Sequence, residues 1–112
     1  MSLNNAKKIK IERLEAIEKK HGVELNVNAY EIKSEYHNYD EARILIEVIG
    51  DIVNPLHFMA SIYNEQGELI GVGSRGDIRP DTFDGIDHIE IEIAAPPGKK
   101  IDKVRVYPQR VR

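Results

Sequence analysis

The sequence predicts a mainly β fold, an antiparallel immunoglobulin- or fibronectin-like β-sandwich of about seven strands preceded by one N-terminal α-helix. Three observations lead to this fold class. Short segments that alternate apolar and polar residues recur roughly every 8–12 residues from position 23 onward. The residues between these segments are typical of tight turns. One helix followed by a run of strands is the order found in sandwiches rather than in βαβ folds.

The first segment has the pattern of a helix. Residues 6–21 contain good helix formers and neither glycine nor proline. The apolar stripe, spaced by three residues along the segment, consists of Ile11, Leu14 and Ile17. Gly22 follows at a position where helices commonly end. The 112-residue chain is therefore expected to contain a helical appendage, residues 1–22, and one β-sandwich domain, residues 23–112.

The segments that follow Gly22 have the period of strands. The predicted strands cover residues 23–29, 42–53, 58–63, 68–74, 88–93 and 101–108. Residues 42–53 are apolar on both faces, which predicts a central strand covered on both sides. Three closely spaced glycines, at positions 71, 73 and 76, suit an edge strand or a crossing between sheets.

The turn at Asn64–Gly67 is the strongest local prediction. It separates two alternating segments, and Gly67 occupies the position that requires a positive φ. Residues 76–85, which include Pro80, are expected to form a loop. A second polar loop is expected between residues 34 and 40.

Two neighbouring stretches resemble one known family. Residues 46–54 resemble the hydrophobic strand followed by Gly-x-Val-x-Asn that opens the FxLYD-type bacterial immunoglobulin-like domains. Residues 58–67 resemble the strand–Tyr–Asp–x–x–Gly hairpin of that family, with Asn64 in place of Asp and Ala60 where a larger residue is common. The resemblance covers about residues 42–76. It implies an immunoglobulin-like fold and a role in adhesion, assembly or spacing, and it transfers no catalytic residue.

The composition excludes several function classes. The chain has no cysteine, which excludes a disulfide framework, a thiolate zinc site and a cysteine nucleophile. A net charge of −3 argues against a strongly basic nucleic-acid binder. No run of 18 apolar residues is present, so no membrane insertion is expected. These features favour the cytoplasm for the chain as given, and an extracytoplasmic location if it is an excised domain.

The mild net charge conceals a strong segregation. Residues 1–22 contain six basic and three acidic residues, and residues 96–112 contain six basic residues and one acidic residue. The 73 residues between them contain four basic and fifteen acidic residues. The basic ends are either solvated or in contact with the acidic middle, within or between chains. A third alternative is contact of the C-terminal basic segment with a nucleic acid or an anionic membrane surface, but Tyr107 is its one interleaved aromatic residue, which gives little support for stacking on nucleic acid. We therefore expect a protein partner or self-association, with a homodimer as one form, and no nucleic acid.

Two loops contain candidate ligand-binding residues. The first has exposed aromatic groups that suit a protein or a sugar, at Tyr36, His37 and Tyr39, unless they only cover the edge of the core. The second has carboxylates spaced by three residues that suit calcium, at Asp81, Asp84 and Asp87. Gly85 permits a sharp turn there, but the alternate ligand positions of an EF-hand are missing. The alternative is an ordinary solvated turn, and no cofactor is expected.

No catalytic motif is evident in the sequence. The four histidines, none of them in an H-E-x-x-H or H-x-H pair, are His21, His37, His57 and His88. No serine lies within a G-x-S-x-G sequence. The sequence therefore predicts a non-enzymatic interaction or assembly module of a larger bacterial protein. The alternatives are a carbohydrate- or calcium-binding module and a hydrolase that gathers a serine or carboxylate beside His37, His57 or His88.

Overall fold

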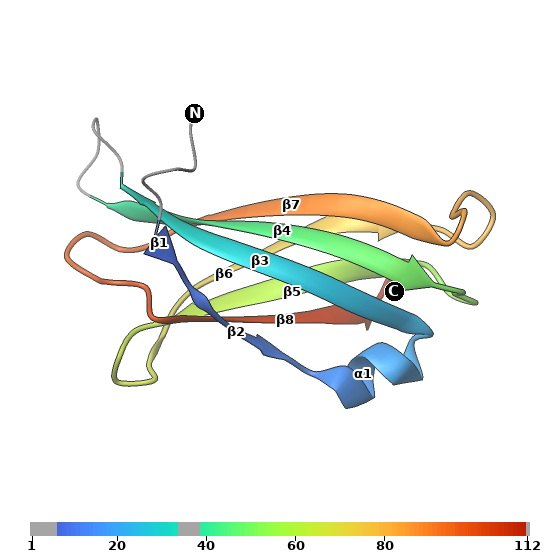
Figure 1. Ribbon diagram of the computed structural model, residues 1–112, viewed down its shortest axis with the longest axis horizontal. Helices are drawn as coiled ribbons and strands as arrows, with labels where there is room; N and C mark the ends of the chain where they lie inside the picture. Colours follow the sequence, from blue (N-terminus) through green and yellow to red (C-terminus); the bar gives the residue numbers. More distant parts are fainter. Residues whose placement is uncertain (1–6, 34–38, 112) are drawn as a thin grey trace.

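The computed structural model describes residues 7–33 and 39–111, which form two packed β-sheets and one short helix (Figure 1). In chain order the elements are β1 (Lys7–Lys8), β2 (Lys10–Arg13), α1 (Glu15–Lys20), β3 (Val23–Lys33), β4 (Asp40–Gly50), β5 (Leu56–Tyr63), β6 (Leu69–Ile78), β7 (Ile86–Ala94) and β8 (Lys103–Arg110). Sheet A has the spatial order β1-β3-β4-β7, and sheet B has the order β2-β8-β5-β6. The prediction of a mainly β sandwich is confirmed at this level.

Strand pairing is antiparallel throughout both sheets except between β2 and β8. Figure 1 shows β3, β4 and β7 in one layer and β5, β6 and β8 in the other. Alternate residues of these strands point between the layers and form the core. The large apolar side chains that are fully buried there include Leu25, Ile44, Ile46, Val48, Leu56, Phe58, Ile62, Ile91, Val104 and Val106.

One prediction about β4 is half right. β4 is central, because it pairs with β3 on one side and with β7 on the other. Its second face is not covered, however, since Leu45 is only half-buried and Ile49 is 39% exposed. A two-layer sandwich covers one face of each sheet, so the apolar residues on the other face of β4 remain at the surface.

The prediction of a helix over residues 6–21 is wrong for most of its length. Only Glu15–Lys20 are helical, and the residues before them form β1 and β2. The physical reason is visible around Ile9, which is 7% exposed between the exposed Lys8 and Lys10. This alternation buries a β-branched side chain and allows strand pairing, which together outweigh the helix propensity of the lysines.

The N-terminal segment is therefore part of the sandwich rather than an appendage. β1 pairs with β3 in sheet A, and β2 pairs with β8 in sheet B. Between them the backbone N–H of Ile9 donates to the carbonyl of Ala29 over 2.9 Å. The segment crosses from one sheet to the other and closes that side of the sandwich (Figure 1).

The hairpin at Asn64–Gly67 is confirmed. Gly67 has a φ of 77°, and its N–H donates to the Asn64 carbonyl over 3.0 Å. The returning strand β6 lies at an edge of sheet B, as expected, but continues to Ile78. A Cβ at Gly73 would lie 2.9 Å from the Ile93 side chain, so glycine allows β6 to approach β7 closely.

Candidate functional site

The outer face of sheet A is organised by the register of three strands. Because paired residues of adjacent strands point to the same side, the outward residues form rows across β3, β4 and β7. From one end of the sheet to the other, the three middle rows are Asn26–Glu47–His88, Asn28–Leu45–Glu90 and Tyr30–Arg43–Glu92. We call the outward residues of these three strands the acidic face.

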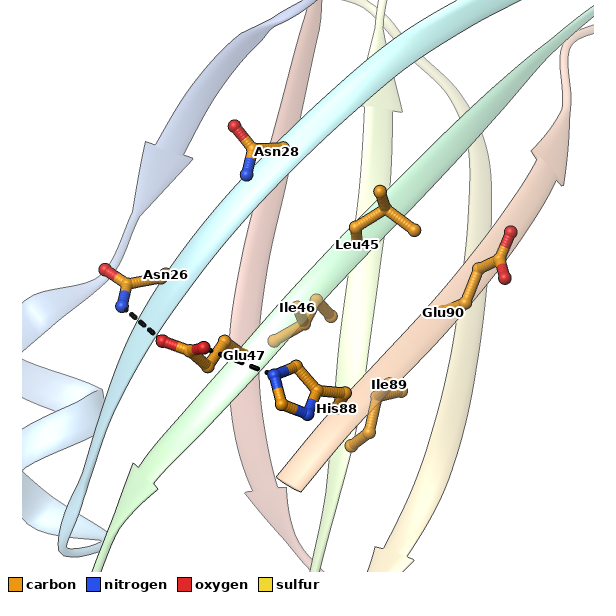
Figure 2. A pocket seen from close by; sticks show the side chains of 8 residues that line it. All are labelled: Asn26, Asn28, Leu45, Ile46, Glu47, His88, Ile89 and Glu90. Carbon is orange, nitrogen blue, oxygen red and sulfur yellow. Dashed lines mark hydrogen bonds and ion pairs between the residues drawn. The ribbon is translucent and has the colours of Figure 1, made fainter. Parts of the chain in front are cut away.

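Two of these rows line a shallow depression of about 580 Å³ (Figure 2). Its lining residues are Asn26, Asn28, Leu45, Ile46, Glu47, His88, Ile89 and Glu90. Figure 2 shows the polar side chains of β3 and β7 on either side of Leu45 and Ile46 of β4. The depression therefore offers hydrogen-bonding groups around an apolar side chain, that of Leu45, and such a combination is usual in binding sites.

Glu47 is held at the centre of its row. The Nδ2 of Asn26 donates to Glu47 Oε1 over 2.8 Å, and His88 Nε2 lies 3.2 Å from Glu47 Oε2. The Asn26 hydrogen bond, followed by that of His88, lowers the pKa of the Glu47 carboxyl below its ordinary value. Glu47 is thus an ionised, oriented acceptor.

The neighbouring rows hold an ion-pair network. Arg43 Nε lies 3.1 Å from Glu90 Oε1, and Arg43 Nη2 lies 3.3 Å from Glu92 Oε1. Burial, and then the proximity of Glu92, raises the pKa of Glu41 above its ordinary value. Arg43 therefore forms ion pairs with two carboxylates, those of Glu90 and Glu92, at this end of the face.

The acidic face has an excess of negative charge. Its carboxylates are Glu24, Glu41, Glu47, Glu90 and Glu92. Arg43 is the single arginine or lysine at the outward positions of β3, β4 and β7 as the structure describes them, and Lys8 lies beside Tyr30 on the adjoining β1. This surface attracts cationic groups.

The basic terminal segments meet in sheet B instead. β2 and β8 bring Lys10, Lys103 and Arg105 close together. Each cation pairs with an acid of the other terminal segment: Glu12 of β2 contacts Arg105 and lies 3.8 Å from Lys103, and Asp102, just before β8, lies 3.7 Å from Lys10. Of the charged residues that lie in strands, the acidic ones from the middle of the chain are therefore mostly in sheet A, and the basic ones from its two ends are mostly in sheet B.

The predicted aromatic site falls mostly outside the described residues. Tyr36 and His37 belong to the stretch 34–38, which the structure does not describe. Tyr39 is half-buried just before β4 and does not line the depression. The binding role assigned to these three residues stays a prediction.

The predicted calcium ligands are not assembled into a cluster. Asp81 and Asp84 are exposed in the segment between β6 and β7, and Asp87 is exposed in β7, where its Oδ1 accepts the N–H of His88 over 2.7 Å. Within residues 7–33 and 39–111, no group of three or more histidine, aspartate or glutamate side chains is placed to hold a metal ion. The structure therefore gives the calcium hypothesis no geometric support.

The residues of the depression were missed because no single segment contains them. Alternation places Asn26 on the polar side of its strand, and likewise His88, but 62 residues separate the two in the chain. Only the pairing of β3 and β7 with the same strand, β4, brings them to one row. The regular His88–Ile93 alternation was the one signal that marked this surface as an exposed strand face.

Comparison with protein-family models, with curated proteins and with solved structures finds no match for this chain. The similarity to FxLYD-type domains therefore remains an expectation from residues 42–76 alone. In the part of the chain that the structure describes, no helix has the length and apolar character needed to cross a membrane.

Proposed function

We propose that this protein is a non-enzymatic, immunoglobulin-like interaction module that binds a protein partner through the acidic face of sheet A. The observation that carries the proposal is the depression on this face, where Asn26, Glu47 and His88 form one hydrogen-bonded row. The row displays donors and acceptors at strand spacing on a rigid three-stranded surface. Such a surface suits the recognition of polar side chains on another protein.

The strand order supports the immunoglobulin-like part of the proposal. In immunoglobulin domains, strands A, B and E are neighbours in one sheet, and strands C, F and G are neighbours in the other. β3, β4 and β7 correspond to A, B and E, while β5 and β8 correspond to C and F, and β6 takes the place of C′. β2 occupies the place of G but runs parallel to β8, which departs from that pattern.

The charge of the acidic face indicates the chemistry of the partner. Five outward glutamates favour a basic segment, and electrostatic attraction of this kind speeds association and orients it. At one end of the face, Ile49 and Ile86 lie side by side and are 39% and 51% exposed. We therefore propose a partner segment that combines lysine or arginine with an apolar side chain.

The state of the His88–Glu47 pair supports a non-enzymatic role. The hydrolase hypothesis required a carboxylate or serine beside a histidine, and the depression does contain such a pair. However, the His88 side chain is 71% exposed, and the pKa of Glu47 is lowered, which makes it a weaker base. No serine is among the lining residues of this depression.

Site-specific photocrosslinking tests the proposal. A photoreactive p-benzoylphenylalanine replaces His88 in one variant and Val72, 62% exposed on β6 of sheet B, in a matched control. We expect one protein to be crosslinked in the source cells from position 88 and not from position 72, with a lower yield after Glu47→Gln. A crosslink to a second copy identifies self-association. The same products from both positions, or none, contradict the proposal.

Carbohydrate binding is the second candidate, because the polar groups of the depression surround the outward apolar side chain of Leu45. A glycan array probed with the wild-type protein and with Asn26→Ala tests it. Binding to a sugar class that Asn26→Ala weakens favours carbohydrate recognition. The absence of binding to all glycans leaves the protein partner as the better proposal.

A further inference from the structure

A second depression lies at the end of the sandwich, where α1 packs against β8. It has a volume of about 690 Å³. We call it the basic depression, and its lining residues are Lys20, His21, Asn54, Gln109, Arg110 and Val111. These residues come from the end of α1, the segment before β5 and the end of β8, so the depression is separate from the acidic face.

The side chains around the basic depression are cations and hydrogen-bond donors. Lys20 and Arg110 carry positive charge, His21 carries an imidazole, and the lining includes no carboxylate. Burial lowers the pKa of His21, and the charges of Lys20 and Arg110 lower it further. Two permanent cations therefore lie near His21, and no acid is among the described residues that line the depression.

Neutral donors complete the lining. His57 Nε2 lies 2.7 Å from Gln109 Oε1, which orients the carboxamide so that its NH₂ group points away from His57. Asn54 contributes a second carboxamide. Three carbonyls of α1 already have partners: those of Ile17 and Glu18 accept hydrogen bonds from His21 N over 3.2 and 3.1 Å, and that of Lys19 accepts one from Gly22 N over 3.1 Å.

From this arrangement we infer that the basic depression binds a compact oxyanion, a phosphate or carboxylate group, between Lys20 and Arg110 with His21 as an additional donor. The two permanent cations supply the attraction, and an arginine can donate two parallel hydrogen bonds to such a group. The carboxamides of Asn54 and Gln109 supply directional contacts. The same chemistry accepts a free phosphate, the phosphate of a larger molecule or the carboxylate of a protein side chain.

NMR titration of the full chain with inorganic phosphate, at constant ionic strength maintained with NaCl, tests this inference. We expect saturable chemical-shift changes at residues 20–21 and 109–111. We also expect the pKa of His21 to rise by about half a unit or more, because a bound anion favours the imidazolium form. A parallel titration with acetate separates the sources: a response to phosphate alone indicates a phosphate group, and an equal response to both indicates a carboxylate-compatible site.

Two double variants provide the controls. Lys20→Gln with Arg110→Gln should abolish the saturable changes, and both side chains are exposed, so the fold should be retained. Lys99→Gln with Lys100→Gln removes the same charge from the exposed segment before β8 and should leave binding unchanged. Shifts that do not saturate, or that both double variants reduce equally, would show a nonspecific ionic effect and overturn the inference.

Discussion

Arg13 and Glu18 form a paired contact that joins three elements of the fold. Arg13 Nη2 donates to Glu18 Oε1 over 2.7 Å and Arg13 Nε donates to Glu18 Oε2 over 3.1 Å, while the buried N–H of Leu25 donates to Glu18 Oε1 over 3.1 Å. The Glu18 side chain is 2% exposed, and that of Arg13 is 29% exposed. One carboxylate thus ties the end of β2 and the start of β3 to α1.

Loss of Glu18 should therefore be strongly destabilising. Glu18→Ala leaves a partly buried guanidinium and the Leu25 N–H without their acceptor, and we expect a loss of about 3 kcal/mol in the free energy of unfolding. Urea denaturation measures this change. Glu15→Ala, an exposed position on the same helix, is the control and should cost less than about 0.5 kcal/mol. Equal effects of the two substitutions would mean that the ion pair contributes nothing specific.

Two glycines with nearly equal positive φ angles allow steric crowding to be separated from backbone strain. Gly22 has a φ of 78° and Gly67 a φ of 77°, but a Cβ at Gly22 would lie 2.4 Å from the Asp51 carbonyl oxygen, whereas a Cβ at Gly67 meets nothing within 4 Å. Gly67→Ala should cost about 1 kcal/mol from strain alone. Gly22→Ala should cost about 2–4 kcal/mol because the crowding adds to the strain. Thermal unfolding of both variants checks the difference, and similar costs would contradict it.

The lowered pKa of Glu47 depends first on Asn26 and then on His88. Asn26→Ala should raise the Glu47 pKa toward its ordinary value, and His88→Ala should raise it by less. A depressed carboxyl pKa stabilises the fold above the pKa of the unfolded chain, and this contribution is lost as the pH falls through the pKa of the folded state. Side-chain carboxyl NMR measures both variants. A larger rise of the Glu47 pKa in His88→Ala than in Asn26→Ala would contradict the view that Asn26 is the main cause of the lowered pKa.

The contribution of Glu41 to stability should depend on pH in the opposite sense to that of Glu47. Its pKa is raised by burial and then by Glu92, so the ionised form destabilises the fold, and stability is lost as the pH rises through the raised pKa. Glu41→Gln should therefore increase stability at pH 7 by a few tenths of a kcal/mol. The gain should shrink below the ordinary carboxyl pKa, where Glu41 is protonated in both folded and unfolded chains. Melting temperatures at pH 7 and pH 3.5 test this, with Glu24→Gln as an exposed control on the same face.

The parts of the fold that the sequence predicts correctly are those where one local pattern decides the outcome. The alternation around Phe58, Ala60 and Ile62 identifies β5, and the turn residues identify the hairpin at Gly67. The helix prediction for the N-terminal segment is wrong because the stripe of Ile11, Leu14 and Ile17 fits a helix equally well, and only pairing with β3 and β8 decides for strands. Such a choice is made by tertiary pairing, which a local pattern does not contain.

The candidate site on the acidic face cannot be predicted from the sequence for a related reason. The depression requires Asn26, Glu47 and His88 to share a row, and a shift of one residue in either pairing would turn a partner to the other face. The predictions of binding sites at Asp81–Asp87 and around Tyr39 rest instead on the proximity of suitable residues in the sequence. Their residue types suit ligands, but closeness in sequence does not place several side chains around one point.

The parallel pairing of β2 with β8 has a mechanical consequence. The register joins Lys10 to Lys103 and Arg13 to Val106, so the first strand of sheet B and the last strand of the chain run in the same direction. Tension applied at Lys7 and at Val111 pulls these two strands past each other along their length. Their ladder hydrogen bonds then carry the force together in shear, instead of opening one after another, and the pair acts as a clamp against stretching.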